Sequence, residues 1–227
     1  MIPIRDTIPS QRTAWVVRLL VMANIAGFVL ELQQGQRIEA FLYRFGVVPA
    51  YWGVSGVGDI VQWPQLALSL LTFQFLHGSL LHLGSNMLYL WIFGDNVEDR
   101  LGHLRFLFFY LFSGAIAAVV ELLVNSQTAL PLIGASGAIA GVLGAYFVLF
   151  PFARILTLIP LFITWQSVEV PAFLFLGFWF ALQWLQGLVT IGQISGASGG
   201  IAWWAHVGGF VSGLILVGLF HPRRRGS

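Results

Sequence analysis

Residues 134–144 read GASGAIAGVLG and residues 205–213 read AHVGGFVSG, and both lie inside long apolar stretches of the chain. Each of them places small residues four positions apart, a spacing that lets two helix backbones approach closely in lipid. The glycines concerned are Gly137 and Gly141 in the first stretch, and Gly209 and Gly213 in the second. The pattern predicts two membrane helices packed on each other, with the serine of the first stretch near the histidine of the second.

The composition is that of a membrane protein. Of the 227 residues, 58% are hydrophobic and only 9% are charged, and the mean hydropathy is +0.84, whereas soluble domains carry about 25% charged residues. The chain has no cysteine, which excludes disulfides and thiolate metal sites. Lysine is absent, and with eleven arginines the formal net charge is only +2, so the charge indicates no nucleic-acid partner.

Six apolar stretches approach the roughly 20 residues that a membrane helix needs. They cover residues 15–32, 78–96, 104–124, 135–152, 168–189 and 202–220. Residues 33–66, which contain Gly, Pro, Tyr and Trp, are predicted to form a long loop at the membrane interface. Residues 155–163 are apolar but short and are interrupted by Pro160, so we expect a connection there rather than a span. The sequence therefore predicts an all-α membrane protein with a six-helix bundle.

The arginines orient this bundle. With the N-terminus inside, eight arginines fall in inner segments and only Arg37 and Arg44 in outer segments. The inner ones are Arg5, Arg12, Arg100, Arg105, Arg154, Arg223, Arg224 and Arg225. The positive-inside rule thus favours both termini inside, as an even number of spans requires. We expect a cytoplasmic N-terminal segment (residues 1–13), a transmembrane domain (residues 14–220) and a basic cytoplasmic tail (residues 221–227).

Three groups of polar residues fall at a similar depth in this topology, a few residues below the outer surface. His82 and Asn86 lie in the outer half of the second helix, Ser136 opens the fourth, and His206 lies one turn into the sixth. Polar groups inside apolar spans are costly and tend to mark function. Their common depth predicts one shared site.

The residue types suit acyl transfer. A serine hydroxyl becomes a useful nucleophile beside a base, and His206 is the candidate base for Ser136. Attack on a carbonyl creates an oxyanion that needs preorganised donors, which the backbone N–H of Ser136 and the side chains of His82 and Asn86 could supply. No carboxylate is expected at the depth of His206, so the sequence predicts a dyad rather than a triad, with no metal.

The chain resembles the rhomboid family of intramembrane serine proteases over residues about 14–220. The matching motifs are His77-x4-His82-x3-Asn86, Gly134-x-Ser136-Gly137 and Ala205-His206-x-Gly208-Gly209-x3-Gly213. The resemblance implies a serine endopeptidase that cleaves transmembrane protein substrates near the extracytoplasmic face, with a serine–histidine dyad and no cofactor. It gives Ser136 the role of nucleophile, His206 that of base, and His82 and Asn86 that of oxyanion binding.

The resemblance also covers positions around the site. The residues expected to support it are His77, Gly134, Gly137 and Gly209. Glu98 and Arg100 match a family element at the inner end of the second helix, residues 33–66 match the first loop, and residues 192–200 match the cap over the site. Many bacterial members have an aromatic residue one turn after the nucleophile, where this chain has Ala140.

Substrate helices are expected to enter the bilayer-embedded site sideways, past the fifth helix. Its bulky side chains include Phe173, Phe178, Trp179 and Trp184. The absence of an Arg- and Ser-rich transit peptide favours a bacterial plasma membrane over a mitochondrion. The oligomeric state is not indicated by the sequence.

Two other hypotheses remain open. A catalytically inactive rhomboid-like protein that binds membrane proteins without cutting them would share the fold, although such relatives typically lack the serine or the histidine. A small transporter or channel would predict internal repeats and discontinuous helices, which we do not find in the sequence. Taken singly, Ser136 could be a packing residue and Asn86 an interhelical hydrogen-bonding residue. Glu121, near the outer end of the third helix, is expected to reach water.

Overall fold

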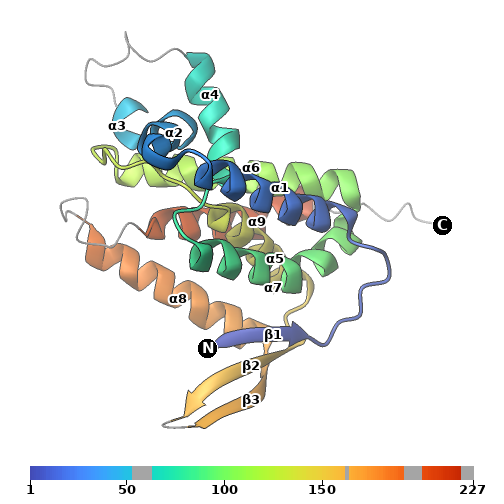
Figure 1. Cartoon of the computed structure of the whole chain (residues 1–227). Coiled ribbons are helices and arrows are strands. Elements are labelled where there is room, and N and C mark those ends of the chain that lie inside the picture. The colour runs from blue at the N-terminus through green and yellow to red at the C-terminus, as the bar shows by residue number, and fades with distance from the viewer. Residues whose placement is uncertain (53–62, 162–163, 192–200, 221–227) are drawn as a thin grey trace.

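The computed structural model describes residues 1–52, 63–161, 164–191 and 201–220, and these residues are mostly helical (Figure 1). The long helices are α1 (Trp15–Leu32), α5 (Leu80–Leu101), α6 (His103–Val124), α7 (Ser136–Leu149), α8 (Ala172–Thr190) and α9 (Trp203–Phe220). The expected first loop contains η1 (Gly35–Arg37), α2 (Ile38–Phe45), α3 (Pro49–Trp52) and the start of α4 (Trp63–Thr72), which is followed by η2 (Phe73–Phe75). The predicted spans therefore correspond to helices, and the predicted loop is largely helical.

The membrane spans are fewer by length and composition than the six expected. Among the described residues, α1, α6, α8 and α9 are long and apolar enough to cross a bilayer. A fifth span results if α5 and the bent segment before it, which meet at 82°, are taken as one. The helix α7 has only 14 residues, about 21 Å at 1.5 Å per residue. It ends at Leu149 because Pro151 follows directly after its C-cap.

The predicted helical membrane bundle is found, but the fold is not all-α, because three strands form a sheet at one end of the bundle (Figure 1). The strands β1 (Ile2–Asp6), β2 (Arg154–Leu161) and β3 (Thr164–Pro171) pair antiparallel in the order β1-β2-β3. The N-terminal segment is thus an edge strand of this sheet. Of residues 155–163, expected as a connection, residues 155–161 belong to β2, and residues 162–163 lie outside the described residues. Alternating β-branched residues favour the strand conformation in β2 and β3. The fifth helix begins at Ala172, since residues 168–171 still belong to β3.

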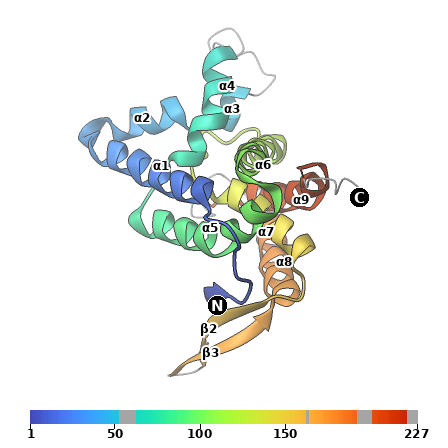
Figure 2. The same cartoon turned by 90° about the vertical axis from the view of Figure 1, so that its right-hand side faces the viewer.

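The close packing predicted from the small residues is confirmed between α7 and α9. A Cβ on Gly209 would collide with the carbonyl oxygen of Gly137, and a Cβ on Gly213 with that of Gly141. The helix α7 lies among α5, α6, α8 and α9 (Figure 2), and its residues 137–146 are all buried. A short helix can therefore sit at the centre of the bundle with its N-terminus held against α9.

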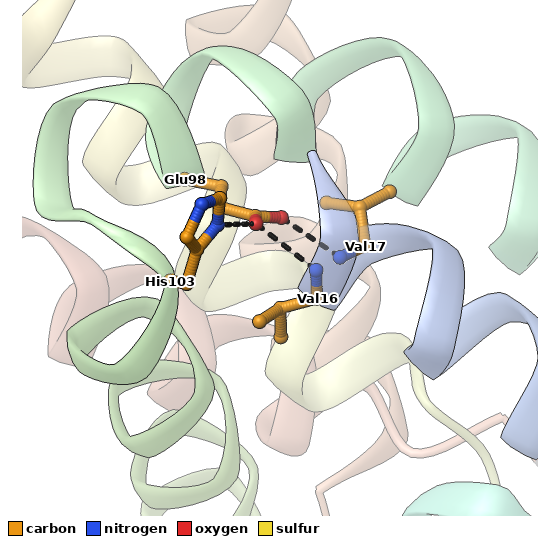
Figure 3. Close-up of polar contacts among 4 residues, drawn as sticks. All are labelled: Val16, Val17, Glu98 and His103. Carbon is orange, nitrogen blue, oxygen red and sulfur yellow. Dashed lines mark hydrogen bonds and ion pairs between the residues drawn. The ribbon is translucent and has the colours of Figure 1, made fainter. Parts of the chain in front are cut away.

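Near the C-terminal end of α5, the carboxylate of Glu98 connects the helices α1, α5 and α6 (Figure 3). It accepts hydrogen bonds from the backbone N–H groups of Val16 at 3.0 Å and Val17 at 2.8 Å, which are free donors in the first turn of α1. Its Oε1 atom also lies 2.5 Å from Nδ1 of His103, the first residue of α6. Glu98, one of the two residues that match the rhomboid family element at this end of the helix, is buried. It holds the start of α1 and the start of α6 against the end of α5.

Candidate functional site

Ser136 and His206 come from the two helices that pack through glycines. Ser136 is the first residue of α7, and His206 lies in the first turn of α9. The Oγ atom of Ser136 is 2.8 Å from Nε2 of His206. The hydroxyl also lies at the N-terminus of α7, where free backbone N–H groups and the helix dipole favour negative charge.

The other ring nitrogen of His206 contacts a side chain that the sequence analysis missed. Nδ1 of His206 is 2.7 Å from Oε1 of Gln183, which lies on α8. An amide oxygen can only accept a hydrogen bond, so Nδ1 carries the proton and the lone pair of Nε2 faces Ser136. The signal available in the sequence was an amide within the apolar residues 172–189, a costly placement in a membrane helix.

Asn86 is held by a chain of polar contacts that reaches α1. Its Nδ2 atom donates to Nε2 of His77 at 3.0 Å, and the backbone N–H of His77 donates to Oε1 of Glu31 at 2.8 Å. All three residues are buried. His77 thus supports Asn86 directly, and Glu31, which the sequence analysis did not single out, supports the segment that carries His77.

His82 lies against the loop that precedes Ser136. Gly134 has φ +126°, a conformation that L side chains rarely adopt. A Cβ at this position would lie 2.8 Å from Cε1 and 2.9 Å from Nε2 of the His82 ring. Gly134 therefore allows the ring to approach Ser136, and its backbone N–H is tied to the carbonyl of Phe73 at 2.9 Å.

Glu121 was expected to reach water, but it is buried and its carboxylate accepts hydrogen bonds within the protein. Its Oε2 atom accepts from the backbone N–H of Ala205 at 2.9 Å, and its Oε1 atom accepts from Nδ2 of Asn125 at 2.5 Å. Glu121 thus satisfies a free donor in the first turn of α9, one residue before His206. The carboxylate thus holds the start of the helix that carries His206.

A cavity of about 510 Å³ contains all four side chains of the candidate site. It is lined by Gly78, Ser79, Leu81, His82, Ser85, Asn86, Ile133, Ser136, Ile201, Ala202 and His206. Volumes of 300–1,000 Å³ are typical of ligand pockets. Within the described ranges, no cluster of three His, Asp or Glu side chains could hold a metal ion. The expected cap, residues 192–200, and the basic tail, residues 221–227, lie outside the described residues.

The arrangement defines a multi-pass helical membrane protein with a serine and a histidine in contact in a cavity that both polar and apolar side chains line. A family model described as the Rhomboid domain matches residues 64–223, well over half of the chain. The chain belongs to the rhomboid family. The matched residues include α5, α7, α8 and α9, which carry the candidate site, whereas α1 with Glu31 precedes them.

Three curated relatives show the range of similarity. Rhomboid protein 1, mitochondrial, of Saccharomyces cerevisiae is 39% identical over 93 residues, which cover 39% of this chain and 27% of that protein. RHOMBOID-like protein 6, mitochondrial, of Arabidopsis thaliana is 27% identical over 160 residues, covering 60% and 52%. RHOMBOID-like protein 4 of the same plant is 26% identical over 223 residues, covering 89% and 51%. The chain thus spans about half the length of these relatives or less, and their names give no support to a bacterial plasma membrane.

Proposed function

We propose that this protein is an intramembrane serine endopeptidase that cleaves transmembrane protein substrates. The observation that carries the proposal is the 2.8 Å contact between Oγ of Ser136 and Nε2 of His206, with Nδ1 of the same ring already occupied. In that arrangement the hydroxyl donates to a free lone pair, which is the starting geometry for general-base activation of a serine.

The reaction follows from these positions. Nε2 of His206 takes the proton as Oγ of Ser136 attacks the scissile carbonyl carbon, and the carbonyl electron pair moves to the oxygen. Collapse of this intermediate breaks the C–N bond, and the imidazolium gives its proton to the departing amine. A water molecule, deprotonated by the same nitrogen, then hydrolyses the acyl-enzyme and regenerates the serine.

The oxyanion is stabilised by donors around the N-terminus of α7. The backbone N–H of Ser136 belongs to the first turn of that helix, and the side chains of His82 and Asn86 line the same cavity. Since Nδ2 of Asn86 carries two hydrogens and one of them is directed to His77, the second is available for the oxyanion. Preorganised donors of this kind act without reorganisation during the reaction.

The proposal includes six spans with both termini inside. The count takes the four helices that are long and apolar enough, adds α5 with the bent segment before it as a fifth span, and adds the short helix α7 as a sixth, because protein rather than lipid surrounds α7. The arginine distribution supports this orientation, in which the cavity faces the extracytoplasmic side. Substrates are transmembrane proteins that reach the cavity through the bilayer.

The proposal is tested with purified protein reconstituted in liposomes together with a single-span substrate. Wild type should cleave the substrate and react with a fluorescent fluorophosphonate, while Ser136→Ala and His206→Ala should do neither. The matched control is Ser85→Ala, which removes another hydroxyl of the same cavity and should leave labelling in place. Cleavage that persists in folded Ser136→Ala contradicts the assignment. Folded wild type that neither cleaves nor reacts favours a rhomboid-like protein that binds without cutting.

A further inference from the structure

We propose that Gln183 of α8 is a positioning residue for His206: its amide oxygen selects the imidazole tautomer and ring orientation in which Nε2 faces Ser136. This inference rests on the proposed peptidase function and adds a third side chain to the expected dyad. The contact that carries it is the 2.7 Å distance between Oε1 of Gln183 and Nδ1 of His206.

The placement of Gln183 points to a specific role. Its side chain is 8% exposed, whereas Gln186, three residues further along the same apolar helix, is exposed. An amide inside a membrane protein is stable only when it is hydrogen-bonded. Gln183 meets this requirement through the imidazole, in a helix whose other buried residues are Ala, Phe, Leu and Gly.

The chemistry explains why the base needs such a partner. A neutral imidazole can carry its proton on either nitrogen, and with the proton on Nε2 it cannot accept the proton of Ser136. An acceptor at Nδ1 fixes the proton there and prevents rotation of the ring about its Cβ–Cγ bond. Trp179 and Trp203 flank the ring with centroid distances of 6.0 Å and 6.2 Å, but aromatic carbon faces offer no comparable acceptor.

A neutral amide and a carboxylate differ in how they would orient the imidazole ring. The amide orients the ring without adding a negative charge to a membrane interior, where an ionised group is costly. It also stabilises the imidazolium less strongly than a carboxylate would, because hydrogen bonds between charged groups are the stronger ones. The arrangement is therefore a serine, a histidine and an amide contributed by three helices, α7, α9 and α8.

The test compares Gln183→Leu, Gln183→Glu and the matched control Gln186→Leu in the liposome assay. Gln183→Leu should lower kcat and the rate of fluorophosphonate labelling by about 10²-fold, the scale of a misplaced catalytic group, with KM within about twofold of wild type. Gln183→Glu keeps an oxygen acceptor and should recover at least about tenfold of that loss. Gln186→Leu should match wild type. A folded Gln183→Leu as active as Gln186→Leu overturns the inference while leaving the peptidase function intact.

A second measurement needs no variant of Gln183. In protein labelled with ¹⁵N-histidine, with His206→Ala used to assign the signal, neutral His206 should show a protonated Nδ1 and an unprotonated Nε2. A signal from the opposite tautomer overturns the inference even if Gln183→Leu fails to fold. If wild type neither cleaves substrate nor reacts with the probe, the failure belongs to the proposed function instead.

Discussion

At the scale of single residues, the sequence predicted the pair Ser136 and His206, but it did not predict which side chains support that pair. Ser136, His206 and Asn86 could be found because each is a polar residue in an apolar stretch. Gln183 was missed although it too is polar and lies in an apolar stretch, because the sequence does not distinguish it from Gln186 in the same stretch. Its contact with His206 and the contact of Glu31 with His77 became visible only in the structure. Only packing of the helices shows which buried amide or carboxylate meets which part of the site.

The contact between His77 and Asn86 gives a prediction at this scale. Asn86→Ala should lower kcat by about 10²–10³-fold, as expected for loss of one oxyanion donor. His77→Ala should lower it less, because it removes only the group that holds the Asn86 amide. The double variant should be no worse than Asn86→Ala, since the two residues act through one hydrogen bond. Losses that add in the double-mutant cycle would show that His77 acts independently of Asn86.

At the scale of helices, the glycine spacing predicted which faces meet, but the strength of that constraint comes from the structure. Gly144 on α7 and both Gly209 and Gly213 on α9 face backbone carbonyls of the opposite helix, so neither helix can accept a side chain at these positions. The apolar pattern of the sequence did not predict that α7 is too short to count as a span on its own. The apolar residues continue to Phe152, whereas the helix ends at Leu149.

Two glycines of α9 give a matched pair for testing this packing. Gly213→Ala places a methyl group on the carbonyl of Gly141 and should lower the free energy of unfolding by about 1–3 kcal/mol or more. Gly218→Ala, on the same helix, has no atom within 4 Å of its Cβ and should be neutral or stabilising by up to about 1 kcal/mol. Thermal unfolding in detergent measures both, and equal melting temperatures would contradict the packing.

The side chains of α8 give a second prediction at this scale. Phe178 is 51% exposed and Trp184 is 42% exposed, on a helix at the edge of the bundle (Figure 1). If substrate enters past α8, Phe178→Ala should raise the turnover of a transmembrane substrate without changing the rate of labelling by a small probe. Phe112→Ala, an exposed phenylalanine of α6, is the control. Turnover that is unchanged or lower in folded Phe178→Ala counts against entry along this helix.

At the scale of the whole molecule, the sheet is the feature that sequence reasoning failed to predict. Its strand β1 pairs with a strand far away along the chain, with Ile2 opposite Leu158 and Asp6 opposite Ile155, and no local pattern encodes such a pairing. The strand also connects to the bundle, because Oδ2 of Asp6 accepts hydrogen bonds from the hydroxyl of Tyr146 on α7 at 2.5 Å and from Nδ2 of Asn96 on α5 at 2.7 Å. The N-terminal segment is therefore part of the folded structure.

Asp6 gives a prediction about pH. Burial raises the pKa of Asp6 to about 6, despite the hydrogen bond from Tyr146, whereas an ordinary aspartate titrates near 3.8. Between these values the unfolded chain is ionised and the folded protein still holds the proton, so the contribution of Asp6 to stability falls as pH rises from about 4 to about 6 and is constant above. Asp6→Asn should remove this part of the pH dependence of the melting temperature. An identical slope in the variant would contradict the shift.

If the protein is the peptidase that we propose, the position of Gln183 limits how fast it can work. Gln183, which we propose orients His206, lies on α8, the helix past which we expect substrates to enter. Movement of α8 that opens the site to substrate therefore lowers the reactivity of Ser136. A displacement of α8 large enough to admit a substrate helix withdraws the acceptor at Nδ1, and the serine is then poorly activated until the helix returns. Substitutions that loosen α8 step by step should therefore first raise the overall rate and then, beyond an optimum, lower it. The protein would cleave slowly but would favour substrates that stay bound until α8 has returned.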